Sequence, residues 1–446
     1  MKSVIKVKEI KIENLRNVKS GSICTPVQFS EFEKADIVGL YGQNGSGKTT
    51  IVEAFSIVNQ LFSGGNNYES FPGNLDNMIC FIEQYATIEI EFLVKNSDGE
   101  YFLKYFVELC EGKDRVYPTK EKLSYRENEK FKRYKNLISK ENDSIQFRAK
   151  DLSEFHEEDR IKVMVLNKFA KERSMSFIFH KELREMLQGE LEHFEFNLIE
   201  NIAVDFYRDL HVINNESIGY LMMKHMMPFS IHLDRKRGFI PYDLETPALL
   251  PTELYTVLVE AIAQTNKVLT AIIPGLTIEI RHINDQLNDR GEEAVRFEFL
   301  SRREDSLLPL RTESEGILKI ISVLSVLIAV YNNPNATVVI DELDAGIYEY
   351  LLGELLTVIS EGGKGQLLFT SHNLRVLEVL TPKDLWFTTV NADHRYIQLK
   401  GIKKMNNTRD VYLRSIQLGG QDELIYQKTK THTIKRAFRK AGVRNE

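Results

Sequence analysis

Residues 42–49 read Gly-Gln-Asn-Gly-Ser-Gly-Lys-Thr and fit the pattern G-x-x-x-x-G-K-[ST] of a phosphate-binding loop. Glycines allow the backbone to fold so that several N–H groups point at an anion, and a following helix adds its positive dipole end. Lys48 is expected to reach the β- and γ-phosphates of a nucleotide, and the Thr49 hydroxyl is expected to bind Mg²⁺. The nucleotide-binding residues are therefore expected to be Gly42, Asn44, Gly45, Ser46, Gly47, Lys48, Thr49 and Thr50.

A second group of candidate residues follows the apolar run at 337–340. A buried strand there would deliver Asp341 to its C-terminal end, where the carboxylate could hold Mg²⁺ directly or through water. Glu342 would then be placed to polarise an attacking water as general base. Many strands end in Asp or Glu, so these acids indicate a site only together with the upstream loop.

Ser314 and Gly316 precede an apolar helical stretch, Gly316–Tyr331. A small hydroxyl and a glycine at a helix N-terminus can form a second anion-binding end. A plain helix cap is the alternative interpretation.

The elements that position these residues are strands and helices in alternation. An apolar run at Ile37–Tyr41 predicts a buried strand before the loop, and Thr49–Phe62 has apolar residues at helical spacing after it. Alternating patterns at Ile5–Ile12, Ala86–Val94 and Tyr101–Leu109 predict a β-rich N-terminal part. Lys181–Leu210 is predicted to be helical, and residues 234–251 are predicted to be loop-like. The C-terminal part predicts helices and strands at Leu254–Ile272, Gly316–Tyr331, Thr337–Ile340, Tyr348–Ser360 and Gln366–Thr370. This order is typical of an α/β fold with a mostly parallel sheet.

The motifs GQNGSGKT, SEGILK, VVIDELDAGI and LLFTSHN occur in the order and approximate spacing of the OLD/SMC-like branch of ABC-type ATPases, which the sequence resembles over roughly residues 1–110 and 255–400. This branch includes AAA ATPase-type subunits of prokaryotic anti-phage defence systems. The resemblance implies an ABC-type P-loop ATPase head, with a mixed or parallel sheet, flanking helices, a β-rich N-terminal lobe and an inserted helical region. It also implies ATP and Mg²⁺ as cofactors.

The same resemblance assigns further residues. Ser314 and Gly316 would be signature residues that act in trans on the γ-phosphate held by another subunit. Asp344 would be the D-loop residue at a dimer interface, and His372 would sense the γ-phosphate and take part in catalysis with Glu342 and Lys48. His372 could instead be structural. Arg16 resembles a nucleotide-contacting arginine, although a solvated surface arginine fits the sequence equally.

The sequence departs from the family pattern in several respects. The signature is a short S-E-G, no long coiled coil or CxxC hook is present, and little chain follows His372. A chromosome-organising protein or a full OLD nuclease is therefore disfavoured, and any effector, possibly a nuclease, is expected on a separate polypeptide. A homodimer or a higher homo-oligomer of dimers is expected.

The composition of the chain limits which partners and which location can be expected for the protein. The chain has 446 residues, of which 43% are hydrophobic and 27% are charged, and its net charge is −6. Any nucleic-acid contact must therefore come from local patches, such as the basic segment 428–446, which could instead be a solvated tail. The apolar runs contain polar breaks and no signal peptide is evident, so a cytoplasmic protein without membrane contact is expected.

Four segments are expected: an N-terminal part of the ATPase head at 1–112, an insertion at 113–250, a C-terminal part of the head at 251–400 and an extension with a basic tail at 401–446. The predicted function is an ATP-hydrolysing sensor or scaffold in antiviral defence. A RecF/SMC-like DNA-repair or recombination ATPase and an assembly scaffold with little turnover are the alternatives.

Overall fold

A computed structural model describes residues 3–63, 78–79, 83–112, 116–148, 150–214, 226–233, 236–243, 246–401 and 407–441. At its centre lies a six-stranded sheet of order β10-β17-β18-β3-β19-β20, in which every neighbouring pair except β19 and β20 is parallel. Its strands are β3 (Asp36–Tyr41), β10 (Leu210–Ile213), β17 (Thr337–Ile340), β18 (Gln366–Thr370), β19 (Leu385–Thr388) and β20 (Tyr396–Ile397). The predicted α/β class with a mixed sheet is confirmed.

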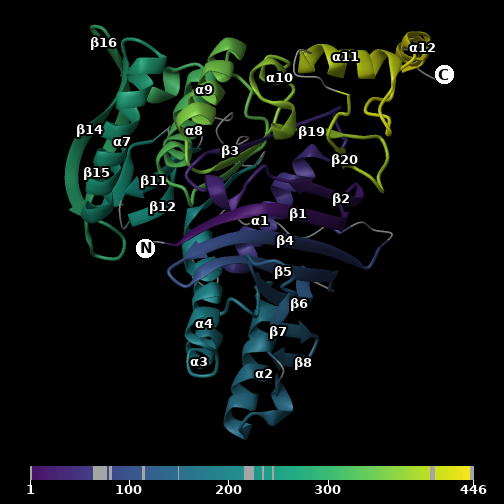
Figure 1. Ribbon diagram of the computed structural model, residues 1–446. Coiled ribbons are helices and arrows are strands. Elements are labelled where there is room, and N and C mark those ends of the chain that lie inside the picture. The colour runs from purple at the N-terminus through teal and green to yellow at the C-terminus, as the bar shows by residue number, and fades with distance from the viewer. Residues whose placement is uncertain are drawn as a thin grey trace, which may run out of the picture.

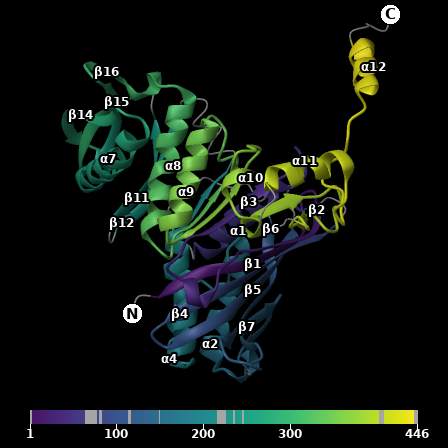
Figure 2. The ribbon, with the colours of Figure 1, turned by 45° about the horizontal axis from the view of Figure 1, so that its top comes forward.

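Both faces of this sheet are buried, which explains why its strands are continuous apolar runs. Alternate side chains enter different cores: Val339 and Leu368 pack with helix α1 (Lys48–Phe62), whereas Val338 and Leu367 pack on the opposite face. That opposite face is covered by α8 (Glu315–Asn332) and α9 (Glu349–Gly362), which lie side by side (Figures 1 and 2). Helix α8 is long and apolar enough to cross a membrane, but 67% of that stretch is buried inside the fold.

An antiparallel eight-stranded sheet packs on the other side of α1, below the parallel sheet in Figure 1. It has the order β2-β1-β4-β5-β6-β7-β8-β9, with β1 (Val4–Leu15), β2 (Val18–Cys24), β4 (Tyr85–Asn96), β5 (Gly99–Glu111), β6 (Val116–Glu127), β7 (Lys135–Glu141), β8 (Ser144–Phe147) and β9 (Lys150–Asp151). Two buried polar contacts join the sheets. Lys6 Nζ lies 2.7 Å from Asp36, and the Gln366 amide donates to Val7 O at 2.9 Å and accepts from Val7 N at 2.6 Å.

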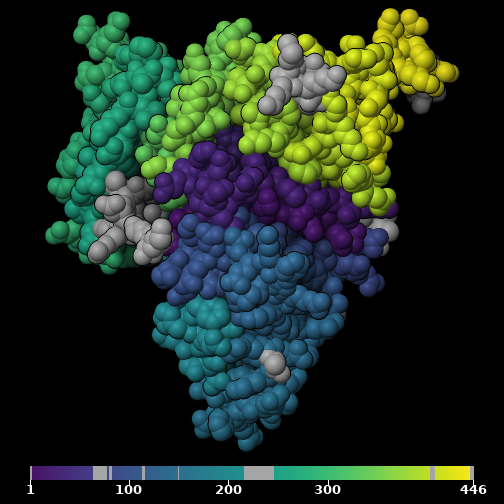
Figure 3. All heavy atoms as spheres, in the orientation of Figure 1, coloured from purple at the N-terminus to yellow at the C-terminus, as the bar shows by residue number. Residues whose placement is uncertain are grey.

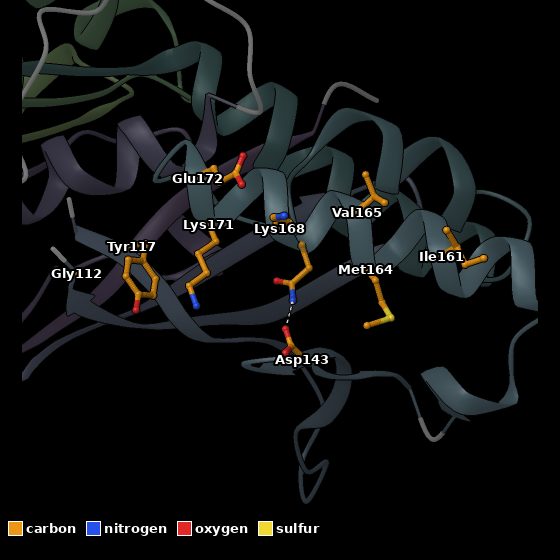
Figure 4. Close-up of a pocket in the computed structure, with 10 residues that line it drawn as sticks. Gly112, Tyr117, Asp143, Ile161, Met164, Val165, Lys168, Lys171 and Glu172 are labelled. Atoms are coloured by element: carbon orange, nitrogen blue, oxygen red, sulfur yellow. Dashed lines mark hydrogen bonds between the residues drawn. The ribbon is translucent and has the colours of Figure 1, made fainter. Parts of the chain in front are cut away.

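A group of helices packs on this antiparallel sheet, and α2 (Glu157–Glu172) and α3 (Lys181–Leu187) lie at the lower tip of the molecule (Figures 1 and 3). The others are α4 (His193–Glu200), a π-helical turn at Asn201–Phe206 and α5 (Tyr207–Asp209). The outer face of α2 exposes Ile161, Met164 and Val165, which line a hollow of about 770 Å³ together with Tyr117 of β6 (Figure 4). The lining residues of this hollow include none of the sequence-predicted site residues.

The remaining elements flank the parallel sheet. A hairpin and a second small antiparallel sheet comprise β11 (Met226–Leu233), β12 (Lys236–Asp243), β13 (Ala248–Pro251), β14 (Leu276–Leu287), β15 (Glu293–Arg303) and β16 (Ser306–Pro309), with α7 (Thr252–Ile272) packed on the latter. The chain continues through α10 (Val376–Val379) and α11 (Thr408–Leu418) to α12 (Thr431–Ala441), which projects from the body in Figure 2. Short 3-10 turns lie at Phe29–Glu31, Leu152–Glu154, Leu310–Thr312 and Pro382–Asp384.

Two local predictions were only partly right. Lys181–Leu210 is mostly helical, as predicted, but the helix is interrupted at residues 188–192 and gives way to strand β10 at Leu210, which is held by parallel pairing with β17. The loop interpretation of residues 234–251 missed β12, which forms a hairpin with the preceding β11, and β13, which pairs with the distant β15. Residues 234–235 and 244–245 of that segment lie outside the described residues. The boundaries at 112, 250 and 400 stay a proposal, although β6 pairs directly with β5 and so extends the N-terminal sheet.

Candidate nucleotide site

The loop at residues 42–49 connects β3 to α1, as the sequence predicts. Its turn requires Gly45 at φ +73° and Gly47 at φ +89°, left-handed backbone that glycine adopts without steric cost. Gly47 is the N-cap of α1, and Lys48 is the first residue of that helix. The loop therefore places the positive end of the α1 dipole where an anion would bind.

Gly42 is required for a different reason, a close approach to the neighbouring strand β19. A Cβ on Gly42 would lie 1.6 Å from Thr388 Oγ1. The same Thr388 hydroxyl lies 2.5 Å from Ser46 Oγ, so it also holds the middle of the loop.

Gly42→Ala is expected to lower the free energy of unfolding by about 2 kcal/mol or more and to weaken nucleotide binding, because the loop must move to relieve this clash. Urea unfolding and a nucleotide titration measure both effects. Gly189→Ala is the control, since nothing lies within 4 Å of its added Cβ. An unfolding midpoint for Gly42→Ala equal to that of the control would contradict the expectation.

The Lys48 ammonium is buried beneath the loop and donates to Gly42 O at 2.9 Å and to Gln43 O at 3.1 Å. Burial lowers its pKa, and the charges of Asp341, Glu342 and Asp344 oppose that shift. The acids therefore lie within electrostatic range of the loop lysine, as a shared nucleotide site requires.

Besides Thr388, three further residues outside the motif hold the loop in shape, and none of them was predicted from the sequence. Asn17 Nδ2 donates to Gly45 O at 2.6 Å, and the buried Tyr396 hydroxyl donates to Gly47 O at 2.7 Å. Arg395 donates to Asn17 O at 2.7 Å and thereby braces Asn17. These residues come from the β1–β2 turn and from β20 or the residue before it, so only the fold brings them to the loop.

Asp341 follows β17 directly and its side chain is fully buried. Thr370 Oγ1, at the end of β18, donates to Asp341 Oδ1 at 2.5 Å. Within the described part of the chain, Asp341 Oδ2 has no hydrogen-bond partner. A buried carboxylate oxygen without a partner is costly, so this atom fits a ligand for a hard cation such as Mg²⁺.

No group of three or more His, Cys, Asp or Glu side chains is arranged to hold a metal ion within the ranges described above. Mg²⁺ is commonly held by one or two protein oxygens together with the phosphates of a nucleotide. Thr49 and Asp341 are the residues that would supply such oxygens here, so metal and nucleotide are expected to bind together.

Glu342 has left-handed backbone, with φ +47°, and its N–H donates to Thr370 Oγ1 at 2.8 Å. Such backbone is uncommon for a non-glycine residue, and it clusters at functional sites. The single Thr370 hydroxyl thus bridges both acids, since it accepts from Glu342 N and donates to Asp341. It fixes the turn that presents Glu342 beyond the end of the sheet.

Asp344 and His372 lie on adjacent loops at the same edge. The His372 N–H donates to Asp344 Oδ2 at 3.1 Å, and both residues line a hollow of about 360 Å³ with Tyr350, Arg375 and Arg409 among its other residues. Burial and the nearby Lys48 charge lower the pKa of the His372 imidazole. The shift favours the neutral imidazole, which can donate one hydrogen bond and accept another through its two ring nitrogens.

Ser314 is the exposed N-cap of α8, and its hydroxyl makes no capping hydrogen bond to the described helix. Gly316 lies against the turn that follows the acids, because a Cβ on it would be 2.2 Å from Gly346 O. Arg16 forms an ion pair with Glu53 of α1, with Nε 2.7 Å from Oε2, and its side chain is 48% exposed. The roles of Ser314, Gly316 and Arg16 toward a nucleotide stay predictions.

Known proteins were compared with the chain. Solved structures of similar shape include an SMC head domain from Thermotoga maritima (13% identity, 89% of this chain and 100% of that chain covered, TM-score 0.39) and an Smc head domain with a coiled coil and joint from Pyrococcus yayanosii (10% identity, 92% and 99%, TM-score 0.44). An Smc head domain from Pyrococcus furiosus bound to the C-terminal domain of ScpA is similar at 11% identity, with 89% and 96% covered and a TM-score of 0.40. No curated protein matches the sequence. The profile of one family, described as "AAA domain, putative AbiEii toxin, Type IV TA system", matches residues 37–378, which is more than half of the chain.

Proposed function

Because the chain belongs to this family of AAA domains, we propose that it binds ATP with Mg²⁺ and hydrolyses ATP at composite sites formed by two copies of the chain. One observation carries the proposal. Lys48 at the start of α1, the adjacent acids Asp341 and Glu342 after β17, and His372 after β18 meet within electrostatic range of one another at a phosphate-binding loop. A structural ion-pair network would neutralise Asp341 Oδ2 with a partner, whereas here that oxygen is free for a ligand.

Each residue then has a role. The loop N–H groups and Lys48 bind the β- and γ-phosphates, and Thr49 and Asp341 hold Mg²⁺, which when bound neutralises phosphate charge. Glu342 orients a water and accepts its proton as the oxygen attacks the γ-phosphorus. The bond from that phosphorus to the β-phosphate oxygen breaks, so ADP and phosphate leave. His372 would donate to the γ-phosphate and report its presence to Asp344.

The composite nature of the site is inferred from α8. The exposed, uncapped Ser314 hydroxyl and the α8 N-terminus form an anion-binding end that faces solvent in a single copy. A second copy would place its own bound γ-phosphate against this end. In a two-fold dimer the arrangement is reciprocal, so two ATP molecules would lie between the two chains.

A mixing experiment tests this arrangement. Ser314→Arg and Lys48→Ala are each expected to abolish hydrolysis alone, because either change damages both sites of a homodimer. In a 1:1 mixture, half the dimers would be heterodimers with one intact site, so about a quarter of the unmutated phosphate-release rate is expected. A mixture with no activity above the separate variants, in proteins that exchange subunits, would contradict a site shared between chains.

The proposed biological role is that of an ATP-dependent sensor or scaffold in antiviral defence, acting in the cytoplasm with a separate effector. The family description, which names a toxin of a type IV toxin–antitoxin system, supports a defence-related role. Helix α12 favours a DNA-directed alternative, since its charged residues within 431–441 are all basic and its side chains are exposed. DNA-stimulated hydrolysis that is lost when residues 428–446 are removed would favour a RecF-like role.

A further inference from the structure

Lys319 is a buried lysine that forms no ion pair with another residue of its own helix, α8. It lies in the apolar helix α8 and is 0% exposed, and its ammonium has no hydrogen-bond partner among the residues that the structure describes. An unpaired charge in the interior is strongly disfavoured, so burial favours the neutral amine and only nearby negative charge favours the ammonium.

Two other buried lysines differ from Lys319, because the ammonium of each has a hydrogen-bond acceptor and a carboxylate nearby. Lys6 Nζ lies 2.7 Å from Asp36 and donates to Lys34 O at 2.6 Å. Lys140 Nζ donates to Pro118 O at 3.3 Å and lies 3.6 Å from Glu121. Both are paired in place, whereas Lys319 is not.

Lys319 lies on the part of α8 that is close to the acidic turn 341–344. Gly316 lies against Gly346 of the turn that follows them, and Lys319 is three residues further along α8, on the same face of the helix. Burial lowers the Lys319 pKa to about 8, and the charges of Asp341, Glu342 and Asp344 oppose that shift. These three acids are therefore within electrostatic range of Lys319, but they form no ion pair with it.

Two of these acids carry a carboxylate oxygen that, like the Lys319 ammonium, lacks a partner among the described residues. Asp341 Oδ2 and Asp344 Oδ1 are also buried without a hydrogen-bond partner in the described part of the chain. The unpaired ammonium on α8 and the two unpaired carboxylate oxygens of the acidic turn thus carry opposite charge within electrostatic range of one another. Opposite charges attract, and a divalent cation bound at Asp341 would repel the ammonium.

We propose that Lys319 is a positioning residue. Its ammonium balances the negative charge of the acidic turn 341–344, and it opposes the binding of a divalent cation at Asp341. This inference rests on the proposed metal site.

The test is the affinity for Mn²⁺ of the full chain saturated with ADP, measured by the loss of the free-ion paramagnetic signal beyond the loss that ADP alone causes. Lys319→Met removes the charge and nearly keeps the volume, so the Mn²⁺ dissociation constant is expected to fall about tenfold or more. Lys319→Arg keeps the charge and is expected to bind Mn²⁺ like the unmutated chain. Lys364→Met, at an exposed lysine, is the matched control.

Lys319→Gln is measured in parallel, because it loses the charge but keeps a polar end that tolerates partial hydration. A tenfold gain in either folded variant supports the proposal. Unchanged Mn²⁺ affinity in a folded neutral variant, while Asp341→Asn weakens Mn²⁺ binding, overturns the role of Lys319 and leaves the metal site standing. An Mn²⁺ affinity that Asp341→Asn leaves unchanged overturns the proposed metal site and this inference with it.

Discussion

Glu342→Gln is expected to lower the rate of ATP hydrolysis by about 10²–10⁴-fold while ATP still binds. The amide cannot accept the proton of the attacking water, but it keeps the size of the carboxylate. The loop at 42–49, Asp341 and the Thr370 bridge are untouched, because Thr370 Oγ1 contacts the backbone of residue 342 rather than its side chain. Binding without turnover should therefore trap the ATP-bound assembly.

Two measurements check this expectation, phosphate release and the mass of the protein by light scattering with ATP and Mg²⁺. A stable dimer or larger species is expected only with ATP and only in the Gln variant. Glu361→Gln is the control, since Glu361 is exposed on α9. Hydrolysis by Glu342→Gln at the unmutated rate would show that another group is the base.

The trapped assembly also addresses the biological role. A protein that co-purifies with Glu342→Gln in the presence of ATP, and is absent with Lys48→Ala, would be the proposed effector. An unmutated rate that is already near zero, despite an intact Glu342, would favour the assembly scaffold over the hydrolysing switch.

Lys48→Ala is expected to raise the dissociation constant for ATP by about a hundredfold or more, because charge-assisted hydrogen bonds to the phosphates are lost. The variant also leaves the carbonyls of Gly42 and Gln43 without their present donor. Binding of a fluorescent ATP analogue measures the affinity, and a thermal unfolding curve separates a local defect from a folding defect.

Lys34→Ala is the matched control, since the Lys34 side chain is 71% exposed and pairs only locally with Glu31 at 2.6 Å. ATP affinity in Lys48→Ala within a few-fold of this control would exclude Lys48 from the phosphate site. Loss of ATP binding together with loss of ATP-driven assembly would link the loop to the dimer, as the composite site requires.

Part of the candidate site could be predicted from the sequence because its signals are local. A strand, a glycine-rich turn and a helix start lie within the segment 36–62, and backbone preference alone shapes them. The acids Asp341 and Glu342 were predictable for a similar reason, since an apolar strand must end where charge begins. The fold class followed from the alternation of such strands with amphipathic helices.

Other features could not be predicted, because they depend on which strands become neighbours. The strand order puts β19 beside β3, so Thr388 meets Ser46 and forbids a side chain at Gly42. The same order puts β18 beside β17, so Thr370 bridges Asp341 and Glu342. Strand β10 is held by its pairing with β17, and its own four residues gave no strand prediction.

The sequence by itself determined that this protein has a phosphate-binding loop, two acids at a strand end and an α/β alternation to hold them, because each of these is encoded by residues close together in the chain. Only the tertiary structure decided that Asn17, Thr388 and Tyr396 brace that loop and that Lys319 is buried without a partner beside the acidic turn. A lysine within an apolar helix was a visible signal, but burial and partnership are properties of packed elements. They arise when the helix and the sheet meet, and no local pattern contains them.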